Sequence, residues 1–387
     1  MTPEIYHSFK EISREDWQAL VPESFPFASY DFLSALETTG CLGRRTGWVP
    51  VIAVLRPAIV GHGITAALVA FIKNNSYGEY IFDFAWAQAH EASGAQYYPK
   101  IVSAIPFTPA TGPKLLFAAE LPTAARQNAA DALLTALADF AKKMGSSSEH
   151  FLFIPEEQIP YFKPPAYFLR HSFQFHWRNA GYKNFEDFLA SLKGKRRREI
   201  VRERSQVAKV GLKIERLTGA KLTAEHGQIM YQFYLSTLDK MSGMNYLTPE
   251  FFTTVFTTMK DNILFVLATN DDGMPVAGAL NFYGNSTLFG RQWGCLEEYK
   301  SLHFELCYYQ GIEFAIEKKF TLFEAGAQGE HKFQRGFLPS LTYSAHQVHH
   351  TQMDVAIRNH VDYEKSQIKA MIVDYMEHSP FATKGNS

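Results

Sequence analysis

The chain has 387 residues, of which 46% are hydrophobic and 20% charged, and its formal net charge is −1. This length exceeds what one hydrophobic core usually serves, so two globular domains are expected and a disordered chain is excluded. The near-zero charge excludes a global field that would recruit DNA or an anionic membrane, so any contact with nucleic acid must come from a local patch.

Cysteine content and apolar runs indicate the compartment. The three cysteines are widely spaced and fit a reducing environment without a disulfide framework. Residues 1–17 lack the basic flank and apolar run of a signal peptide, and no apolar stretch approaches the roughly 20 residues that span a bilayer. We therefore expect a cytoplasmic protein without a transmembrane segment. No CxxC or HExxH pattern occurs, so no metal site is expected.

The first half of the sequence reads as mixed helix and strand. Its predicted elements, in chain order, are a helix at 29–40, strands at 48–56, 63–74 and 79–87, a helix at 126–145 and a strand at 150–155. Pro160, Pro164 and Pro165 then interrupt any periodic element and mark a domain boundary.

The second half repeats the pattern more clearly. Its predicted elements are a helix at 184–211 with a kink at Gly194, a strand at 212–217, helices at 224–241 and 249–260, a hairpin at 263–283, a strand at 286–294, a helix at 303–320, a strand at 321–326 and a helix at 355–376. Helices laid against antiparallel strands predict an α+β protein. The predicted domains are 1–165 and 166–350, followed by a C-terminal helix and short flexible tail at 351–387.

A glycine-rich loop after the 321–326 strand concentrates ionisable side chains. Glu330, His331, Lys332 and Arg335 lie within six residues, at the open end of a predicted sheet. Lys332 and Arg335 are suited to hold a phosphate or carboxylate, while His331 and Glu330 are suited to move a proton. The alternative is a solvated loop whose charges only keep it soluble.

The helix at 303–320 begins with two more candidates, His303 and Glu305. They lie where the helix dipole favours anions, although they are equally explained as a helix cap and a first-turn carboxylate. Cys307 follows His303 by four residues, which allows a Cys–His nucleophile, but mid-helix cysteines are mostly small core residues.

A basic segment at 193–204 holds seven basic side chains, among them Arg197 and Arg198, against Glu199 and Glu203. Such an excess suits the phosphates of a nucleotide or of tRNA. A solvated helix face with internal ion pairs explains the same pattern.

A further set of residues suggests a pocket for an acceptor. Tyrosine and tryptophan combine an apolar body with a polar tip, which suits gripping an elongated substrate, although core packing explains most of them equally well. The candidates are Lys73, Tyr77, Asp83 and Trp86 in the first half and Trp293, Tyr308 and Gln328 in the second.

Several of these segments together resemble a known family. "NSYGEYIFDFAWA", "YYPK", "PFTPATGP", "GRQWG", "LHFELCYYQ" and "GAQGEHKFQRGF" are similar to the FemAB-like predicted N-acyltransferases, a branch of the GNAT superfamily. The resemblance implies two tandem GNAT-like domains with mainly antiparallel sheets. It also implies a substrate channel at or near their junction, with transfer of an acyl group to an amine.

We assign roles to the site residues from their chemistry together with this resemblance. Glu330, His331, Glu305 and Lys332 are the candidates for proton transfer and oxyanion binding, and Arg291, Gly294, His303, Arg335, Arg197 and Arg198 for the donor phosphates. Arg291 and Gly294 are the only parts of the GNAT pyrophosphate loop that the sequence keeps. The donor is either acyl-CoA or aminoacyl-tRNA, with no tightly bound cofactor, and the acceptor is a small-molecule or peptide amine. A non-catalytic module that binds a peptide, cell-wall fragment or tRNA is the alternative.

Overall fold

The structure, a computed structural model, divides into two compact units, and it describes every residue except 1, 58–62, 242, 328 and 383–387. Unit 1 comprises Met1–Phe173 and Leu341–Ala370, and unit 2 comprises Gln174–Ser340 and Met371–Ser387. Residues 341–370 thus pack with the N-terminal half of the chain, whereas the sequence suggested domains at 1–165 and 166–350. No helix in the described part of the chain has both the length and the apolar character needed to cross a bilayer.

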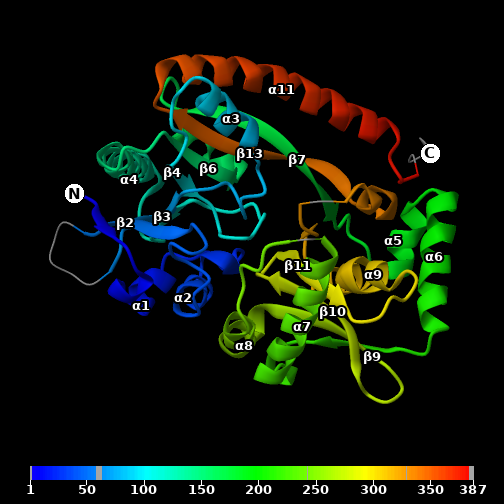
Figure 1. Ribbon diagram of the computed structural model, residues 1–387. Coiled ribbons are helices and arrows are strands. Elements are labelled where there is room, and N and C mark those ends of the chain that lie inside the picture. The colour runs from blue at the N-terminus through cyan, green and yellow to red at the C-terminus, as the bar shows by residue number, and fades with distance from the viewer. Residues whose placement is uncertain (1, 58–62, 242, 328, 383–387) are drawn as a thin grey trace. The chain divides into compact units, whose positions relative to one another are not determined.

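Unit 1 is built on a mainly antiparallel sheet with the strand order β1-β2-β3-β4-β6-β13, in which β5 also pairs with β3 (Figure 1). Its strands are β1 Glu4–Tyr6, β2 Val49–Leu55, β3 Ala66–Lys73, β4 Lys100–Ser103, β5 Leu115–Phe117, β6 Ser148–Ile154 and most of β13 Leu338–Val348. Its α-helices are α1 Arg14–Gln18, α2 Tyr30–Thr38, α3 Phe84–Ala92, α4 Thr123–Lys143 and most of α11 Thr351–Glu377. The apolar face of α4 packs on β2, β3 and β6, which closes the core of this unit.

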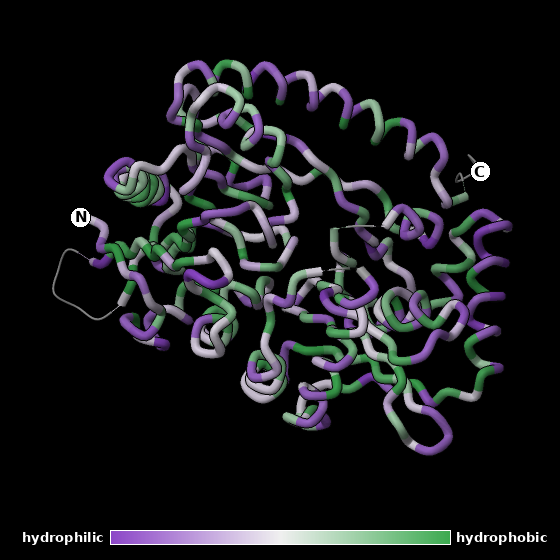
Figure 2. Tube along the Cα trace, in the orientation of Figure 1, coloured by the Kyte–Doolittle hydropathy of each residue, from purple (hydrophilic) through white to green (hydrophobic). Residues whose placement is uncertain are grey.

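Unit 2 has the strand order β7-β12-β11-β10-β9-β8. Its strands are β8 Lys213–Leu217, β9 Ile263–Thr269, β10 Pro275–Tyr283, β11 Thr287–Cys295, β12 Leu322–Glu324 and the second half of β7 Phe168–Arg178. Its helices are α5 Phe185–Ser191, α6 Gly194–Ala208, α7 Ala224–Met241, α8 Pro249–Thr258, α9 Leu302–Phe304 and α10 Gln310–Glu317, with a 3-10 helix, η7, at Glu330–Arg335. Apolar residues follow the strands of both units, whereas hydrophilic residues recur along α6 and α11 (Figure 2).

Each unit contains one parallel strand pair in which the pairing ends before the longer strand does. In unit 2, β11 pairs with β12 only from Thr287–Phe289 to Leu322–Glu324, and β11 then continues to Cys295 without this partner. In unit 1, β4 pairs with β6 from Ile101–Ser103 to Glu149–Phe151, and β6 continues to Ile154. We call the point where each parallel pair ends a fork, beyond which the longer strand continues without its parallel partner.

The α+β class is confirmed, and most predicted elements of unit 2 form close to their expected bounds. The strand predicted at 79–87 is wrong, because Glu79–Asp83 form a loop and α3 begins at Phe84. The alternation is real, since Glu79, Ile81 and Asp83 are buried, but the buried Lys100 rather than a neighbouring strand holds the two carboxylates inside. The helix predicted at 184–211 is two helices, which are interrupted at Leu192 and Lys193.

We predict that Gly294→Ala lowers the melting temperature by about 4 °C or more, because overpacking costs about 1–3 kcal/mol or more. A Cβ at Gly294 would lie 1.7 Å from the backbone oxygen of Phe233, where α7 packs against β11. The matched control is Gly194→Ala, whose Cβ would meet only the flexible end of Arg198 at 3.3 Å. Equal melting temperatures for the two variants, measured by circular dichroism, would contradict this close approach.

Candidate active site in unit 2 and a buried cluster in unit 1

Lys332 lies at the fork between β11 and β12. Its side chain is 2% exposed, and in the described part of the chain its ammonium makes one hydrogen bond, to the Gly326 carbonyl at 2.8 Å. A Cβ built on Gly326 would lie 4.0 Å from Lys332 Nζ and 3.7 Å from the Gly290 oxygen, which places the ammonium beside the first residue of β11 beyond the paired segment. Burial lowers the pKa of Lys332 to about 8. The fork therefore holds a buried cation with a single hydrogen-bond partner among the residues that the structure describes.

His331 and Tyr308 form a second polar pair close to this lysine. Tyr308 Oη and His331 Nε2 are 2.8 Å apart. The ring of His331 lies 5.7 Å from that of His303, which in turn lies 5.0 Å from the ring of Trp293 on β11. Burial, and then Arg335 and Lys332, lowers the pKa of His331, so the imidazole is neutral at neutral pH. These four side chains, all candidates from the sequence, are brought together by the fold.

A π-helical turn at Glu305–Tyr309 separates α9 from α10. Such turns widen a helix by one residue and are frequent at functional sites. Here the turn carries Tyr308 to His331, while Tyr309 donates its hydroxyl hydrogen to Glu203. Gly329, with φ of +109°, lets the chain enter η7 beside His331, because a Cβ there would lie 2.5 Å from the His331 ring.

Arg335 is already saturated by protein groups, which disfavours the phosphate-binding role expected for it. Its guanidinium binds Glu203 through Nη2 at 2.6 Å and Nε at 3.2 Å, and it donates to the carbonyl of His331 at 2.7 Å. Its central carbon also lies 3.4 Å from the ring centre of Phe304. A phosphate would have to displace a buried carboxylate, so we assign Arg335 a structural role that fixes η7.

The carboxylate of Glu305 is likewise held by protein groups. Arg204 donates two hydrogen bonds, of 2.9 and 3.1 Å, to the Glu305 carboxylate, and Gln310 donates a third at 2.8 Å. Glu330 differs, because its side chain is exposed on η7.

The two residues predicted from the GNAT phosphate loop are part of β11. Gly294 packs against the backbone of α7, so its missing side chain serves helix packing rather than a pyrophosphate. Arg291 lies on the same strand with its side chain partly exposed. Burial raises the pKa of Cys307, which keeps it protonated and disfavours a Cys–His nucleophile.

Arg197 and Arg198 are exposed on α6, whose other face points inward. From the inward face, Glu203 binds Arg335 and Arg204 binds Glu305. The sequence interpretation expected Glu203 to pair within its own helix and did not single out Arg204. The helical period of the segment could have revealed this, because it places Glu203 on a different face of the helix from Arg198 and Arg202.

The first-half candidates lie in unit 1, where Lys73 and Asp83 belong to a buried polar cluster. Lys100 Nζ, fully buried, donates to Glu79 at 2.8 Å, Asp83 at 2.5 Å and Ser76 at 2.8 Å. Tyr97 donates to the same Asp83 oxygen at 2.5 Å. Although burial alone would lower the pKa of Lys100, Glu79 and Asp83 hold it above its usual value. Asp83 is therefore an ion-pair partner, and Lys100 was absent from the sequence-based candidates.

Trp86 and Tyr77 have different environments from each other. Trp86 is 3% exposed and packs against His346 and under Arg170, as a core residue of unit 1. Tyr77 is 48% exposed, and its ring lies beside Phe84. Gln328, the remaining acceptor candidate, lies outside the described residues.

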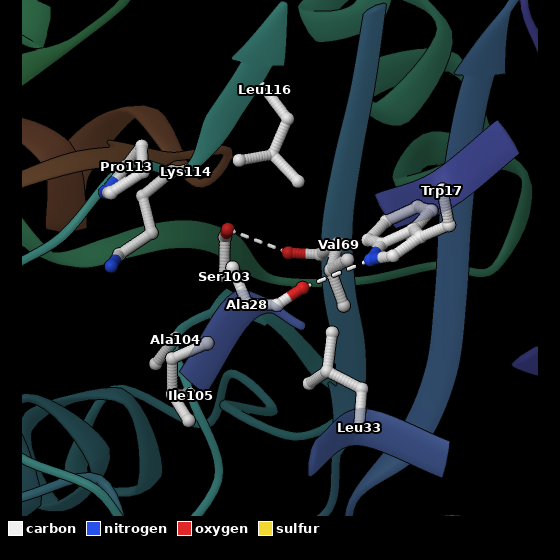
Figure 3. Close-up of a pocket in the computed structure, with 10 residues that line it drawn as sticks. All are labelled: Trp17, Ala28, Leu33, Val69, Ser103, Ala104, Ile105, Pro113, Lys114 and Leu116. Atoms are coloured by element: carbon white, nitrogen blue, oxygen red, sulfur yellow. Dashed lines mark hydrogen bonds between the residues drawn. The ribbon is translucent and has the colours of Figure 1, made fainter. Parts of the chain in front are cut away.

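A small cavity in unit 1 lies between β3, β5 and the N-terminal helices (Figure 3). Its polar groups already bind protein atoms: Trp17 donates to the Ala28 carbonyl at 2.9 Å and Ser103 to that of Val69 at 2.7 Å. None of the sequence-based candidates lines it. Among the residues that the structure describes, no group of three or more His, Cys, Asp and Glu side chains is placed to hold a metal ion.

The chain belongs to the FemAB-like family of peptidoglycan biosynthesis and recognition, which matches residues 8–383. The resemblance stated from the sequence is thereby confirmed. A search among curated proteins found no match.

Solved structures define the fold further. FemX is similar with a TM-score of 0.54 at 10% identity, covering 92% of this chain and 100% of FemX. The C-terminal domain of a protein assigned as a lysylphosphatidylglycerol synthetase from Agrobacterium fabrum has a TM-score of 0.54 at 10% identity, covering 90% and 96% of the two chains. A conserved protein of unknown function from Bacteroides thetaiotaomicron VPI-5482 has a TM-score of 0.52 at 10% identity, covering 90% and 100%.

We predict that Glu203→Gln lowers the free energy of unfolding by about 3 kcal/mol, because it leaves the buried guanidinium of Arg335 without its counter-charge. The matched control is Glu215→Gln, which breaks an exposed pair with Lys213 and should cost less than about 1 kcal/mol. Urea titrations of both variants measure the difference. An equal midpoint shift for the two would show that the Arg335–Glu203 pair does not hold the site.

Proposed function

We propose that the protein is an N-acyltransferase whose reaction takes place in unit 2, at the fork between β11 and β12. The observation that carries the proposal is Lys332, a buried ammonium without a carboxylate partner in the described part of the chain, placed where a parallel strand pair opens. A cation held in a low-dielectric site interacts strongly with charge that develops during a reaction.

Lys332 would bind the oxyanion that forms when an amine attacks an activated acyl carbonyl. In that step a C–N bond forms and the carbonyl oxygen becomes negative. The C–S or C–O bond to the leaving group then breaks and the carbonyl is restored. Removal of one oxyanion donor typically costs about 10²–10³ in turnover.

His331 would accept the proton that the amine loses. In the tautomer whose Nε2–H donates to the Tyr308 oxygen, the Nδ1 lone pair is left for a substrate amine. Burial raises the pKa of Tyr308, so this phenol stays neutral and orients the imidazole instead of ionising. Trp293 and Tyr308 would line the acceptor side. Glu330, exposed two residues before Lys332, would relay the proton to solvent.

The donor would lie along the β12-side edge of β11 from Gly290 to Cys295, where β12 no longer pairs with it. An extended acyl chain or pantetheine-like arm would follow this edge. This edge runs from Lys332 to Trp293, so the donor carbonyl and the acceptor amine would meet between Lys332 and His331.

A second candidate for the donor, aminoacyl-tRNA, is supported by a stripe of cations on α6. Lys195, Arg198, Arg202 and Lys209 are exposed at helical spacing, and no ion pair is formed by them with another described residue. The fourteen steps from Lys195 to Lys209, the C-cap of α6, extend about 21 Å, which spans several phosphates of a nucleic-acid strand. The family's description also covers recognition, so a non-catalytic module for a cell-wall fragment is the alternative to a transferase.

Lys332→Met is expected to lower turnover about 100-fold or more without unfolding the protein. In the wild type the rate should fall as the pH rises through about 8, because Lys332 then loses its proton. On the acid side the rate should fall only below the ordinary histidine range, because the pKa of His331 is lowered. Lys332→Arg should move the alkaline limb upward, since guanidinium stays charged. An alkaline limb that stays in place in Lys332→Arg would remove Lys332 from the reaction.

The donor class is tested by thermal stabilisation with acyl-CoA, uncharged tRNA and aminoacyl-tRNA. A ligand at 100 times its dissociation constant adds about 2.7 kcal/mol to the folded state. Stabilisation by acyl-CoA that survives Arg198→Glu/Arg202→Glu would identify a CoA-type donor at the fork. Stabilisation by aminoacyl-tRNA that this double variant removes, and that Lys142→Glu/Lys143→Glu on α4 retains, would identify tRNA. No response to any donor would favour the binding module.

A further inference from the structure

The helix that carries the reactive groups, η7, has a permissive backbone at both of its ends. It is a 3-10 helix, whose hydrogen bonds have poorer geometry than those of an α-helix. Gly329 precedes it with φ of +109° and Gly336 follows it with φ of +86°, and neither residue has a side chain that limits its backbone. The direction of η7 is therefore set by packing, of which the Arg335–Glu203 pair is one part.

A second part of that packing comes from residues 371–382 of unit 2, which we call the strap. In its helical part, the end of α11, Ile372 and Tyr375 are half-buried and the remaining residues are exposed. The ring of Tyr375 lies 5.1 Å from that of Phe333 on η7 and 5.2 Å from that of Phe175, edge to face with both. Such ring pairs stabilise beyond the apolar area that they bury, so the strap anchors the middle of η7.

The hydroxyl of Tyr375 reaches the first residue of η7. Burial, and then the carboxylate of Glu330 through its charge and a hydrogen bond, raises the pKa of Tyr375. Glu330 is exposed, and it is the residue that we assign to pass the proton to solvent. One side chain of the strap thus holds two residues of η7, the first by its hydroxyl and the second by its ring.

The rest of the strap anchors the other end of η7. Backbone hydrogen bonds of 2.8 and 2.9 Å join residues 380–382 to residues 191–193. They bring the ring of Phe381 within 6.4 Å of that of Phe188. Both rings pack on Gly336, because a Cβ there would lie 2.9 Å from Phe188 and 3.3 Å from Phe381. The strap therefore contacts η7 where it begins, in its middle and where it ends.

We propose that Tyr375 and Phe381 are positioning residues for the reaction at the fork, because they hold η7 in the orientation that keeps Lys332 buried. Phe333 directly follows Lys332, so anchoring its ring fixes the backbone from which the lysine extends. Both strap residues act through η7. This inference rests on the proposed function, since it concerns what controls that same site. A released η7 would admit water to the ammonium and misplace it relative to the donor carbonyl.

The test is the pKa of Lys332, read from the ¹³Cε signals of ¹³C-labelled lysine in a pH titration, with Lys332 assigned by Lys332→Met. We expect Tyr375→Ala to raise this pKa from about 8 by about one pH unit or more toward the ordinary 10.5, because water then reaches the ammonium. Tyr375→Phe keeps the ring packing and should leave the pKa near 8. The matched control is Tyr363→Ala on the same helix, whose side chain is 64% exposed and whose loss should change nothing.

Two further variants keep the result decisive. Phe381→Ala acts at the other end of η7 and should also raise the pKa of Lys332, so it replaces Tyr375→Ala if that variant fails to fold. Val255→Ala removes a fully buried side chain from α8, which packs against α7, and should lower the melting temperature without moving this pKa. An unchanged pKa in the strap variants, or an equal rise in Val255→Ala, would overturn the proposal.

Turnover separates this inference from the transferase proposal. Tyr375→Ala should lower turnover about tenfold or more and shift its alkaline limb upward together with the pKa of Lys332, because a misplaced reactive group is costly. The pKa itself is measured without substrate. A raised pKa in Tyr375→Ala, when Lys332→Met retains full turnover, would uphold the hold of the strap on η7 and reject transfer at Lys332. An unchanged pKa, when Lys332→Met is inactive, would reject the role of the strap alone.

Discussion

The candidate site of unit 2 depends on one buried ion pair, between Arg335 and Glu203. The pair ties η7 to α6, and the hydroxyl of Tyr309 on the π-helical turn joins the same carboxylate. The residue that α6 contributes lies more than 100 residues before those of the other two elements, which are 26 residues apart. With Arg335 fixed, the two residues of η7 between Glu330 and Phe333 have little choice of direction: His331 points to Tyr308 and Lys332 points back to the fork.

This arrangement explains why an arginine and a lysine three residues apart have different roles. Guanidinium is planar, always charged and able to satisfy several acceptors, so it can be buried at acceptable cost when a carboxylate faces it. An ammonium that is buried beside a single carbonyl is less stabilised, and burial lowers the pKa of Lys332 to about 8. Arg335 is thereby fixed in place and always charged, whereas Lys332 loses its proton at a pH near 8. A site that must stabilise transient negative charge needs both properties together, because the reactive cation has to be held in place by groups that do not themselves react.

Much of the fold could be predicted from the sequence, since the hairpin at β9–β10, the helices α7 and α8 and strands β11 and β12 follow local periodicity and turn chemistry. The failures have a physical cause in tertiary contacts. Residues 79–83 alternate like a strand because Lys100 binds Glu79 and Asp83 from the interior, and that lysine is 17 residues beyond Asp83. Strands β7 and β13 were not anticipated, since β13 finds its partner β6 about 190 residues earlier in the chain and no local pattern records such a pairing.

The candidate site shows the same division. The sequence did show that a glycine-rich loop concentrates ionisable groups, and this loop carries the buried Lys332. The sequence did not show which of these ionisable groups form ion pairs. The pairs are made by Glu203, which binds Arg335, and by Arg204, which binds Glu305, and both residues lie on a helix that is basic by composition. Both units present the same physical signature at this level: a cation saturated by carboxylates, Arg335 or Lys100, beside a cation that lacks one within hydrogen-bond distance, Lys332 or Lys73. The saturated member fixes the backbone, and in unit 2 the other member, Lys332, is the one to which we assign oxyanion binding. Chemistry is therefore better sought at incompletely partnered buried charges than at the most densely charged stretch of the sequence.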